Sequence, residues 1–136
     1  MSQENVELVR QAYEAWNRRD FDSALANSDP DVEWTFTAEA RGAAFESVYR
    51  GPDGVREFWN TFIEPWEEVN IEIEEIRDAG DSVLALVVFH ARTRDGLEID
   101  QPFVHVSTFR GSQVIRFEAF AERELQQALE AAGLEE

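Results

Sequence analysis

Apolar and polar residues alternate through four successive segments of this chain, residues 69–77, 82–94, 97–110 and 113–122. A period of two indicates β-strands, because successive side chains of a strand point to opposite faces of a sheet. Gly80-Asp81, Asp95-Gly96 and Gly111-Ser112 separate these segments and are typical of tight hairpin turns. The second half of the chain is therefore predicted to be a run of four antiparallel strands.

The first half of the chain shows helical spacing instead. Val6, Val9, Tyr13 and Trp16 recur at intervals of three and four, which predicts an amphipathic helix over residues 2–20. The pattern further predicts a short helix at 20–25, a strand at 32–36, a long loop at 37–51, a helix at 51–66 and a last helix at 122–134. The predicted fold class is α+β in one domain, residues 1–136, with helices packed on a strongly curved sheet.

Two-residue turns at Asp95-Gly96 and Gly111-Ser112 would set the strand registers. His105 would then lie opposite Glu118 on one neighbouring strand and opposite Leu86 on the other. One face of the sheet would carry Leu84, Leu86, Val88, His90, Phe103, His105, Glu118 and Phe120. A bulge of one residue would undo this assignment.

The opposite face of this predicted sheet is also apolar, and one layer of helices cannot cover both faces. A second copy of the chain is the simplest cover, so the sequence predicts a homodimer through the outer face of the sheet. The residues expected in that interface are Val87, Phe89, Val104, Val106, Phe117 and Ala119.

An opposed His105–Glu118 pair among apolar residues has a chemical use. The carboxylate would orient the imidazole, and the pair could move a proton next to a carbonyl or bind a ligand oxygen. The alternative is that the two side chains satisfy each other in the interior. His90, at the end of its strand, has a rim or solvent role as its alternative, and no metal site is expected from these residues.

Aromatic residues are abundant for a chain of 136 residues, with four tryptophans and ten phenylalanines. They can form a core or a surface on which a flat apolar ligand stacks. The hydroxyls of Tyr13 and Tyr49 could contact such a ligand. The residues predicted to bind it are Tyr13, Trp16, Trp34, Phe36, Tyr49, Trp59, Phe62, Leu86, Val88, His90, Phe103 and Phe120.

Composition narrows the classes of partner. A net charge of −17 would repel nucleic acid. No apolar run approaches the roughly 20 residues of a membrane span, and the first residues do not resemble a signal peptide. The chain has no cysteine, which fits the reducing cytoplasm, and it shows no phosphate-binding loop or dinucleotide fingerprint. The expectation is a cytoplasmic protein without a cofactor or a membrane partner.

Four blocks resemble the SnoaL-like branch of the nuclear transport factor 2-like superfamily. They are "AYEAWNRRDFDSALANSDPDVEW", "YRGPDGVREFW", "DAGDSVLAL" and "FVHVSTFRGSQVIRFEAFAERELQQALEAAGL", and together they cover nearly the whole chain. The resemblance implies a cone-shaped α+β barrel with three N-terminal helices, a C-terminal helix and a pocket. It does not imply one activity, because the superfamily includes isomerases, cyclases, dehydratases, epoxide hydrolases and non-catalytic binders.

The resemblance places family residues on this chain unevenly. The base of the ketosteroid isomerases falls on Phe36, their pocket tyrosine on Ala12, next to Tyr13, and their oxyanion-hole acid on His105. The histidine of the SnoaL-type cyclases also falls on His105, and their acid–base aspartate falls on Glu118 or Ala119. The residues of the limonene epoxide hydrolases find no clear match.

These observations favour a pocket for a small hydrophobic molecule, of cyclic or polyketide type. In the enzymatic hypothesis, the protein transfers a proton next to a carbonyl without a cofactor, with His105 as base or donor and Glu118 as its partner. The alternatives are a non-catalytic binding protein and a dimeric interaction module.

Overall fold

The computed structural model describes residues 2–41 and 45–134. Its helices are α1 (Ser2–Asn17), α2 (Phe21–Ala24), α3 (Ala38–Arg41), α4 (Gly51–Ile63) and α5 (Leu125–Ala132), with a short 3₁₀ helix η1 (Glu122–Glu124) before α5. Its strands are β1 (Ser28–Phe36), β2 (Val48–Arg50), β3 (Trp66–Asp78), β4 (Ser82–Thr93), β5 (Glu98–Arg110) and β6 (Gln113–Ala121). The predicted α+β fold class is confirmed.

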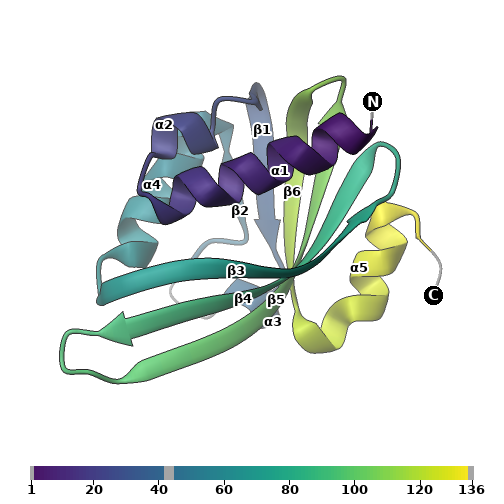
Figure 1. Ribbon diagram of the computed structural model, residues 1–136. Coiled ribbons are helices and arrows are strands. Elements are labelled where there is room, and N and C mark those ends of the chain that lie inside the picture. The colour runs from purple at the N-terminus through teal and green to yellow at the C-terminus, as the bar shows by residue number, and fades with distance from the viewer. Residues whose placement is uncertain (1, 42–44, 135–136) are drawn as a thin grey trace.

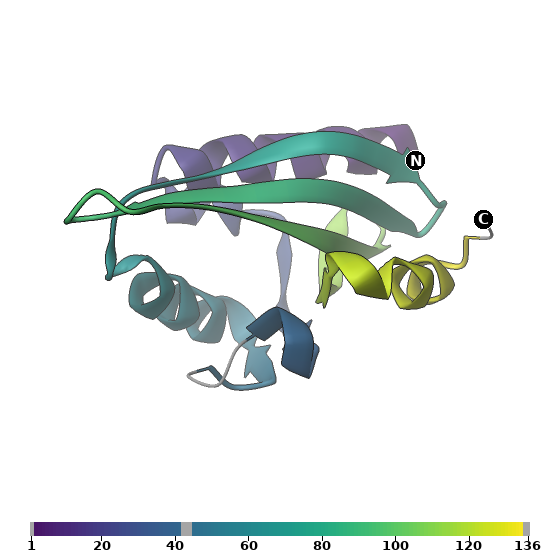
Figure 2. The same ribbon diagram turned by 90° about the horizontal axis from the view of Figure 1, so that it is seen from below.

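The strands of the described ranges form one curved six-stranded sheet in the order β2-β1-β6-β5-β4-β3. β1 runs parallel to β6, while the other neighbouring pairs are antiparallel. Helix α1 crosses one side of the sheet and α5 packs on the other (Figure 1). Seen from below, α5 lies in front of the strands and α1 behind them (Figure 2). The sheet therefore has a covered inner face and a partly covered outer face.

The loop between β4 and β5 is one residue longer than the predicted two-residue turn. The N–H of Thr93 donates to the carbonyl of Leu97 at 2.9 Å, and the N–H of Gly96 donates to the carbonyl of Thr93 at 3.0 Å. Residues 94–96 therefore form the loop. Gly96 has φ 93°, a left-handed conformation that glycine adopts without steric strain.

This longer loop moves the register of β5 against β4 by one residue. His105 lies opposite Ala85, and the predicted pairing with Leu86 is wrong. Phe103 lies opposite Val87 for the same reason.

The β5–β6 hairpin begins as predicted and then departs from the prediction. Arg110 pairs with Gln113 across the two-residue turn, but the register shifts between Thr108 and Phe109. Such a bulge adds one residue to a strand and turns the following side chains to the other face.

The bulge has a direct consequence for the predicted histidine–glutamate pair. His105 lies opposite Ala119, and Glu118 lies opposite Val106. The predicted His105–Glu118 pair is wrong, because the two side chains point to opposite faces of the sheet.

Helix α5 supplies the cover of the outer face. Ala128, Leu129 and Ala132 pack on outward residues of three neighbouring strands. These strand residues are Leu84, Val104, Val106 and Phe120. Their apolar surface is thus buried within one chain, which removes the reason for which a second copy was predicted there.

The residues of the predicted dimer interface are all buried inside the protomer. Val104 and Val106 lie under α5, and the other four face the interior of the curved sheet. They are Val87, Phe89, Phe117 and Ala119. The proposed interface is therefore wrong, while the oligomeric state stays a prediction.

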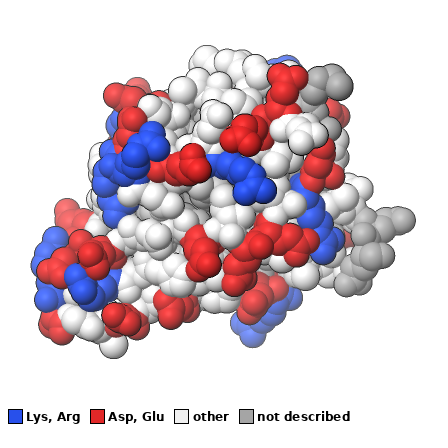
Figure 3. All heavy atoms as spheres, in the orientation of Figure 1, with Lys and Arg blue, Asp and Glu red and all other residues white. Residues whose placement is uncertain are grey.

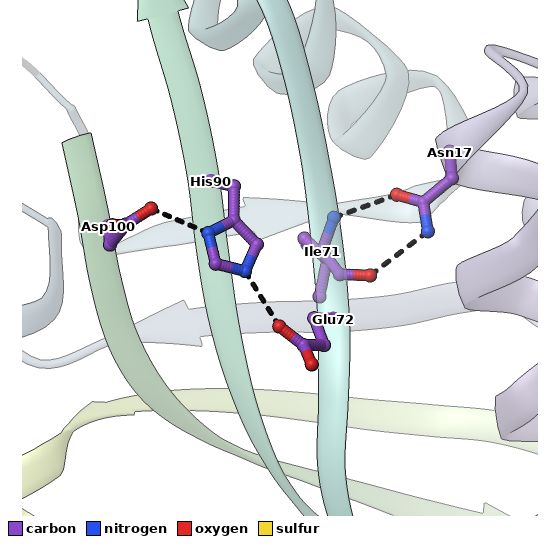
Figure 4. Close-up of polar contacts among 5 residues, drawn as sticks. All are labelled: Asn17, Ile71, Glu72, His90 and Asp100. Carbon is purple, nitrogen blue, oxygen red and sulfur yellow. Dashed lines mark hydrogen bonds and ion pairs between the residues drawn. The ribbon is translucent and has the colours of Figure 1, made fainter. Parts of the chain in front are cut away.

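Two side chains, one at the end of α1 and one just after it, form hydrogen bonds with the backbone of the edge strand β3. Asn17 accepts a hydrogen bond from the N–H of Ile71 at 2.8 Å and donates to its carbonyl at 3.0 Å (Figure 4). Arg19 donates to the carbonyl of Val69 at 2.9 Å. The Asn17 amide thus replaces a neighbouring strand at this point, which protects an edge that otherwise can pair with another chain.

The segment predicted as a loop at 37–51 contains regular structure. Residues of α3 and β2 lie within it, and Val48 to Arg50 pair with β1. Residues 42–44 of this predicted loop lie outside the described residues. No helix in the described part of the chain is long and apolar enough to cross a membrane.

Replacing Asn17 by alanine should lower the free energy of unfolding by about 1–2 kcal/mol, because two backbone groups of Ile71 lose their partner. Urea unfolding measures this change. Asn60→Ala, at an exposed position of α4, is the control for the change of residue type. Equal stability of the two variants would contradict the role of Asn17.

Candidate functional site

A cavity of about 140 Å³ lies between the inner face of the sheet and helices α1 and α4. It reaches from phenylalanines of α4 to the first strand residues of β6. Its lining residues are Leu8, Val9, Ala12, Tyr13, Trp16, Ala24, Asn27, Ser28, Trp34, Phe36, Ala40, Phe45, Phe58, Trp59, Phe62, Ile71, Phe89, Phe103, His105, Ser107, Phe109, Val114, Phe117 and Ala119.

Aromatic rings form most of one end of this cavity. Phe58 and Phe62 come from α4 and contact each other with ring centroids 5.5 Å apart. Trp34 of β1 stacks on Phe117 of the parallel strand β6, with centroids 3.8 Å apart. Because these rings belong to the hydrophobic core as well, the walls are held in place by core packing.

His105 projects into the middle of the cavity from β5. Its Nδ1 lies 2.7 Å from the hydroxyl oxygen of Tyr13 on α1, and the two rings are nearly parallel. Phe117 contacts the imidazole from β6, with centroids 4.7 Å apart. Among the described residues, the other ring nitrogen, Nε2, has no hydrogen-bond partner. This nitrogen is therefore available to a ligand.

Burial keeps both members of the Tyr13–His105 pair neutral. It lowers the pKa of His105 from 6.5 to about 3 and raises the pKa of the Tyr13 hydroxyl above its ordinary value of 10.0. No described residue that lines the cavity is an acid or an arginine. At neutral pH, the site therefore offers hydrogen bonds without charge.

Glu118, the predicted partner of His105, lies on the outer face of β6. Its Oε1 is 3.4 Å from Nε of Arg116, which is two residues away on the same face. The hydrogen-bond partner of His105 is therefore Tyr13, and not Glu118 as predicted from the sequence. A contact between α1 and β5 depends on tertiary packing, which strand spacing cannot show.

The structure divides the predicted site residues, both the catalytic pair and the ligand-binding residues, into two groups. Those that line the cavity are Tyr13, Trp16, Trp34, Phe36, Trp59, Phe62, Phe103 and His105. Those that do not line it are Tyr49, Leu86, Val88, His90, Phe120 and Glu118. Most of the second group point outward because of the one-residue register shifts, whereas Tyr49 packs behind the wall against Phe36 and Phe58.

His90, predicted on the wall or the rim, lies on the outer face. Its two ring nitrogens contact carboxylates on either side, Asp100 at 2.6 Å and Glu72 at 2.8 Å (Figure 4). These contacts raise the pKa of His90 above 6.5. His90 links three strands through its two ring nitrogens and does not line the cavity. Within the described ranges, no group of three or more potential ligands could hold a metal ion.

Several lining residues were not predicted from the sequence. Phe58 was not singled out, Phe89 was predicted in the dimer interface on the outer face of the sheet, and Ser107 was missed because a lone serine in a strand carries no motif. The alternation of β5 could have revealed Ser107, since it shares the face of His105. Asn27 and Ser28 are the other polar lining residues with unassigned roles, and both are half-buried.

The exterior contrasts with the neutral cavity. Acidic side chains are spread over the face seen in Figure 3, with arginines between them. The net charge of −17 makes the surroundings unfavourable for anions.

The pKa values of the two histidines should be shifted from 6.5 in opposite directions. His105 should stay neutral down to about pH 4 because its pKa is about 3, and His90 should lose its proton only above pH 6.5. Imidazole NMR shifts from pH 4 to 8 measure both groups, and His90→Gln assigns the signals. Folding stability linked to His105 should fall as the pH drops below 6.5, since the unfolded chain then binds a proton that the folded one does not. A His105 signal that titrates near pH 6.5 would contradict its buried, neutral state.

Taken together, these features define a cone-shaped α+β domain with an apolar cavity at its centre. The family model of the SnoaL-like domain matches residues 9–117, so the chain belongs to the SnoaL-like family. No relative is found among curated proteins.

Solved structures agree with this assignment. An NTF2-like protein of unknown function from Burkholderia pseudomallei is 26% identical, with a TM-score of 0.78 over 92% of this chain and 95% of that one. TerC, co-crystallised with polyporic acid, is 22% identical, with a TM-score of 0.78 over 92% and 96%. A hypothetical protein with a ketosteroid isomerase-like fold from Catenulispora acidiphila, in complex with trimethylamine, is 17% identical, with a TM-score of 0.72 over 95% of this chain and 94% of that one. The two structures below 25% identity, TerC and the Catenulispora protein, show the fold alone. Such a fold hosts many activities.

Proposed function

We propose that this protein binds a small, neutral, ring-shaped molecule, with the ring among the aromatic walls and one polar atom on Nε2 of His105. The observation that carries the proposal is the unpaired imidazole nitrogen inside an apolar cavity. Most ligand sites have this composition, with apolar walls and a few polar groups that orient the ligand. The co-crystal of TerC with polyporic acid supports the proposal, since it shows an organic molecule crystallised with a protein of the same fold.

The size of the cavity favours one ring over several. An apolar cavity of roughly 150 Å³ in another protein accommodates benzene, and the present cavity of about 140 Å³ is of similar size. A multi-ring polyketide would need more room than the walls leave. We therefore prefer a single-ring ligand to the polyketide-sized one that the family resemblance implies.

A catalytic version of the proposal is weaker. His105 would act as the base next to a bound carbonyl, with Tyr13 as its partner. A conjugate-acid pKa of about 3 makes the neutral imidazole a weak base, and no carboxylate among the described lining residues could assist it. The geometry therefore supports binding better than proton transfer.

Phenol and toluene have the same shape and differ in one hydroxyl, which makes them a direct test. Wild-type protein should bind phenol about three- to tenfold more tightly than toluene, because the hydroxyl meets His105. His105→Phe should reverse the order, since the hydroxyl would then be buried without a partner. Calorimetric titration measures both affinities, with His90→Gln as the control that alters the other histidine.

Two outcomes of this experiment would contradict parts of the proposal. Absence of binding by both probes to the wild-type protein would contradict a ring-sized site. Binding of both probes that is unaffected by His105→Phe would leave a cavity but remove His105 as its polar contact.

The size limit gives a separate prediction. Phe62→Ala, on the α4 wall, should allow 2-naphthol to bind at least about tenfold more tightly than it binds to wild-type protein, because the second ring can occupy the vacated volume. Titration calorimetry measures the change. Leu97→Ala, at a side chain that is 62% exposed, is the control. Tight binding of 2-naphthol to wild-type protein would show that the walls do not limit the ligand to one ring.

A further inference from the structure

A second polar side chain without a partner faces the cavity. Ser107 follows His105 by two residues on β5, so both side chains point to the same face. Ser107 lines the cavity and is only 6% exposed. In the described part of the chain, its hydroxyl has no hydrogen-bond partner. It is also not one of the unpaired polar atoms that are completely buried, so part of its surface is accessible. The hydroxyl is therefore reached from the cavity.

Packing gives no reason for a hydroxyl at this position. Ser107 lies between Val83 on β4 and Phe117 on β6, and Phe109 is the next residue of β5 on the same face. A buried hydroxyl without a partner is unfavourable, so alanine would suit this environment better. The serine hydroxyl becomes favourable at this position once a ligand atom forms a hydrogen bond with it.

The spacing of the two groups restricts the ligand. The Cα atoms of residues two apart on a strand are separated by about 6.6 Å, at roughly 3.3 Å per residue, and their side chains extend to the same side. Two substituents on one six-membered ring span a comparable distance, and a ring of this size fits the volume between the walls. Since no acid or arginine lines the described cavity, a charged substituent would be buried without a counter-ion.

We propose that Ser107 is a second hydrogen-bonding residue of the ligand site, and that the ligand is a neutral ring with two polar substituents, one for His105 and one for Ser107. This inference rests on the proposed function of the same cavity. It changes the expected ligand from any small apolar ring to a doubly substituted one.

Phenol and the three dihydroxybenzenes, catechol, resorcinol and hydroquinone, test this inference by calorimetric titration. At least one dihydroxybenzene should bind wild-type protein about three- to tenfold more tightly than phenol. Ser107→Ala should abolish this advantage, so that this variant binds phenol and the dihydroxybenzenes with affinities within about twofold of one another. Ser107→Thr, which keeps the hydroxyl, should retain the advantage, and Ser112→Ala, in the exposed β5–β6 turn, is the control.

The outcomes separate this inference from the proposed function. If phenol binds and depends on His105, but no dihydroxybenzene gains affinity or the gain survives Ser107→Ala, the role of Ser107 is overturned and the single-contact site stands. If phenol does not bind, both proposals fail. The thermal unfolding midpoint of Ser107→Ala should equal or exceed that of wild-type protein. If the affinity advantage is lost and the midpoint is also lowered, the variant is destabilised, and the view that packing does not need this hydroxyl is overturned.

Discussion

The register of β5 against its two neighbours is the constraint on which the rest of this structure depends. One extra residue in the β4–β5 loop and one bulge beside the β5–β6 turn together decide which side chains face inward. They direct His105 and Ser107 into the cavity and Glu118 out of it. Because strand side chains alternate, no intermediate arrangement exists. The identity of the polar groups in the cavity is therefore set by two small irregularities of the backbone.

The two faces of the sheet are stabilised in different ways. The outer face is covered by small and aliphatic residues of α5, which pack on apolar residues of β4, β5 and β6. The inner face meets bulky rings from α1, β1 and α4, and some of these pack edge to face, such as Trp16 and Trp34 against Trp59. The same aromatic residues stabilise the core and leave room beside His105.

Much of the fold could be predicted from the sequence, because hydrophobic periodicity is a local property. The period of two identified β3 to β6, and the spacing of Val9, Tyr13 and Trp16 identified α1. The short elements α3 and β2 were missed, since β2 has only three residues and is held by its pairing with β1. The aromatic walls were largely foreseen, as Trp34, Trp59 and Phe103 show. In the polar part, His105 and Tyr13 were predicted at the pocket and line the cavity, but Glu118 was predicted as the partner of His105 in place of Tyr13. Asp95-Gly96 is compatible with both a two- and a three-residue loop, and the contact between Tyr13 and His105 joins residues far apart in the sequence.

The hydrogen bond between Tyr13 and His105 joins two neutral groups, each of which can donate or accept. If the tyrosine donates, Nε2 of the imidazole carries the hydrogen and can bind a carbonyl oxygen. If the imidazole donates, Nε2 presents a lone pair and can bind a hydroxyl. Changing between the two states moves protons and requires no displacement of α1 or β5. A carboxylate beside His105 would have fixed one tautomer. The phenol of Tyr13 can donate or accept, so a ligand at Nε2 would be selected by the position of its polar atom, and both donors and acceptors would be tolerated.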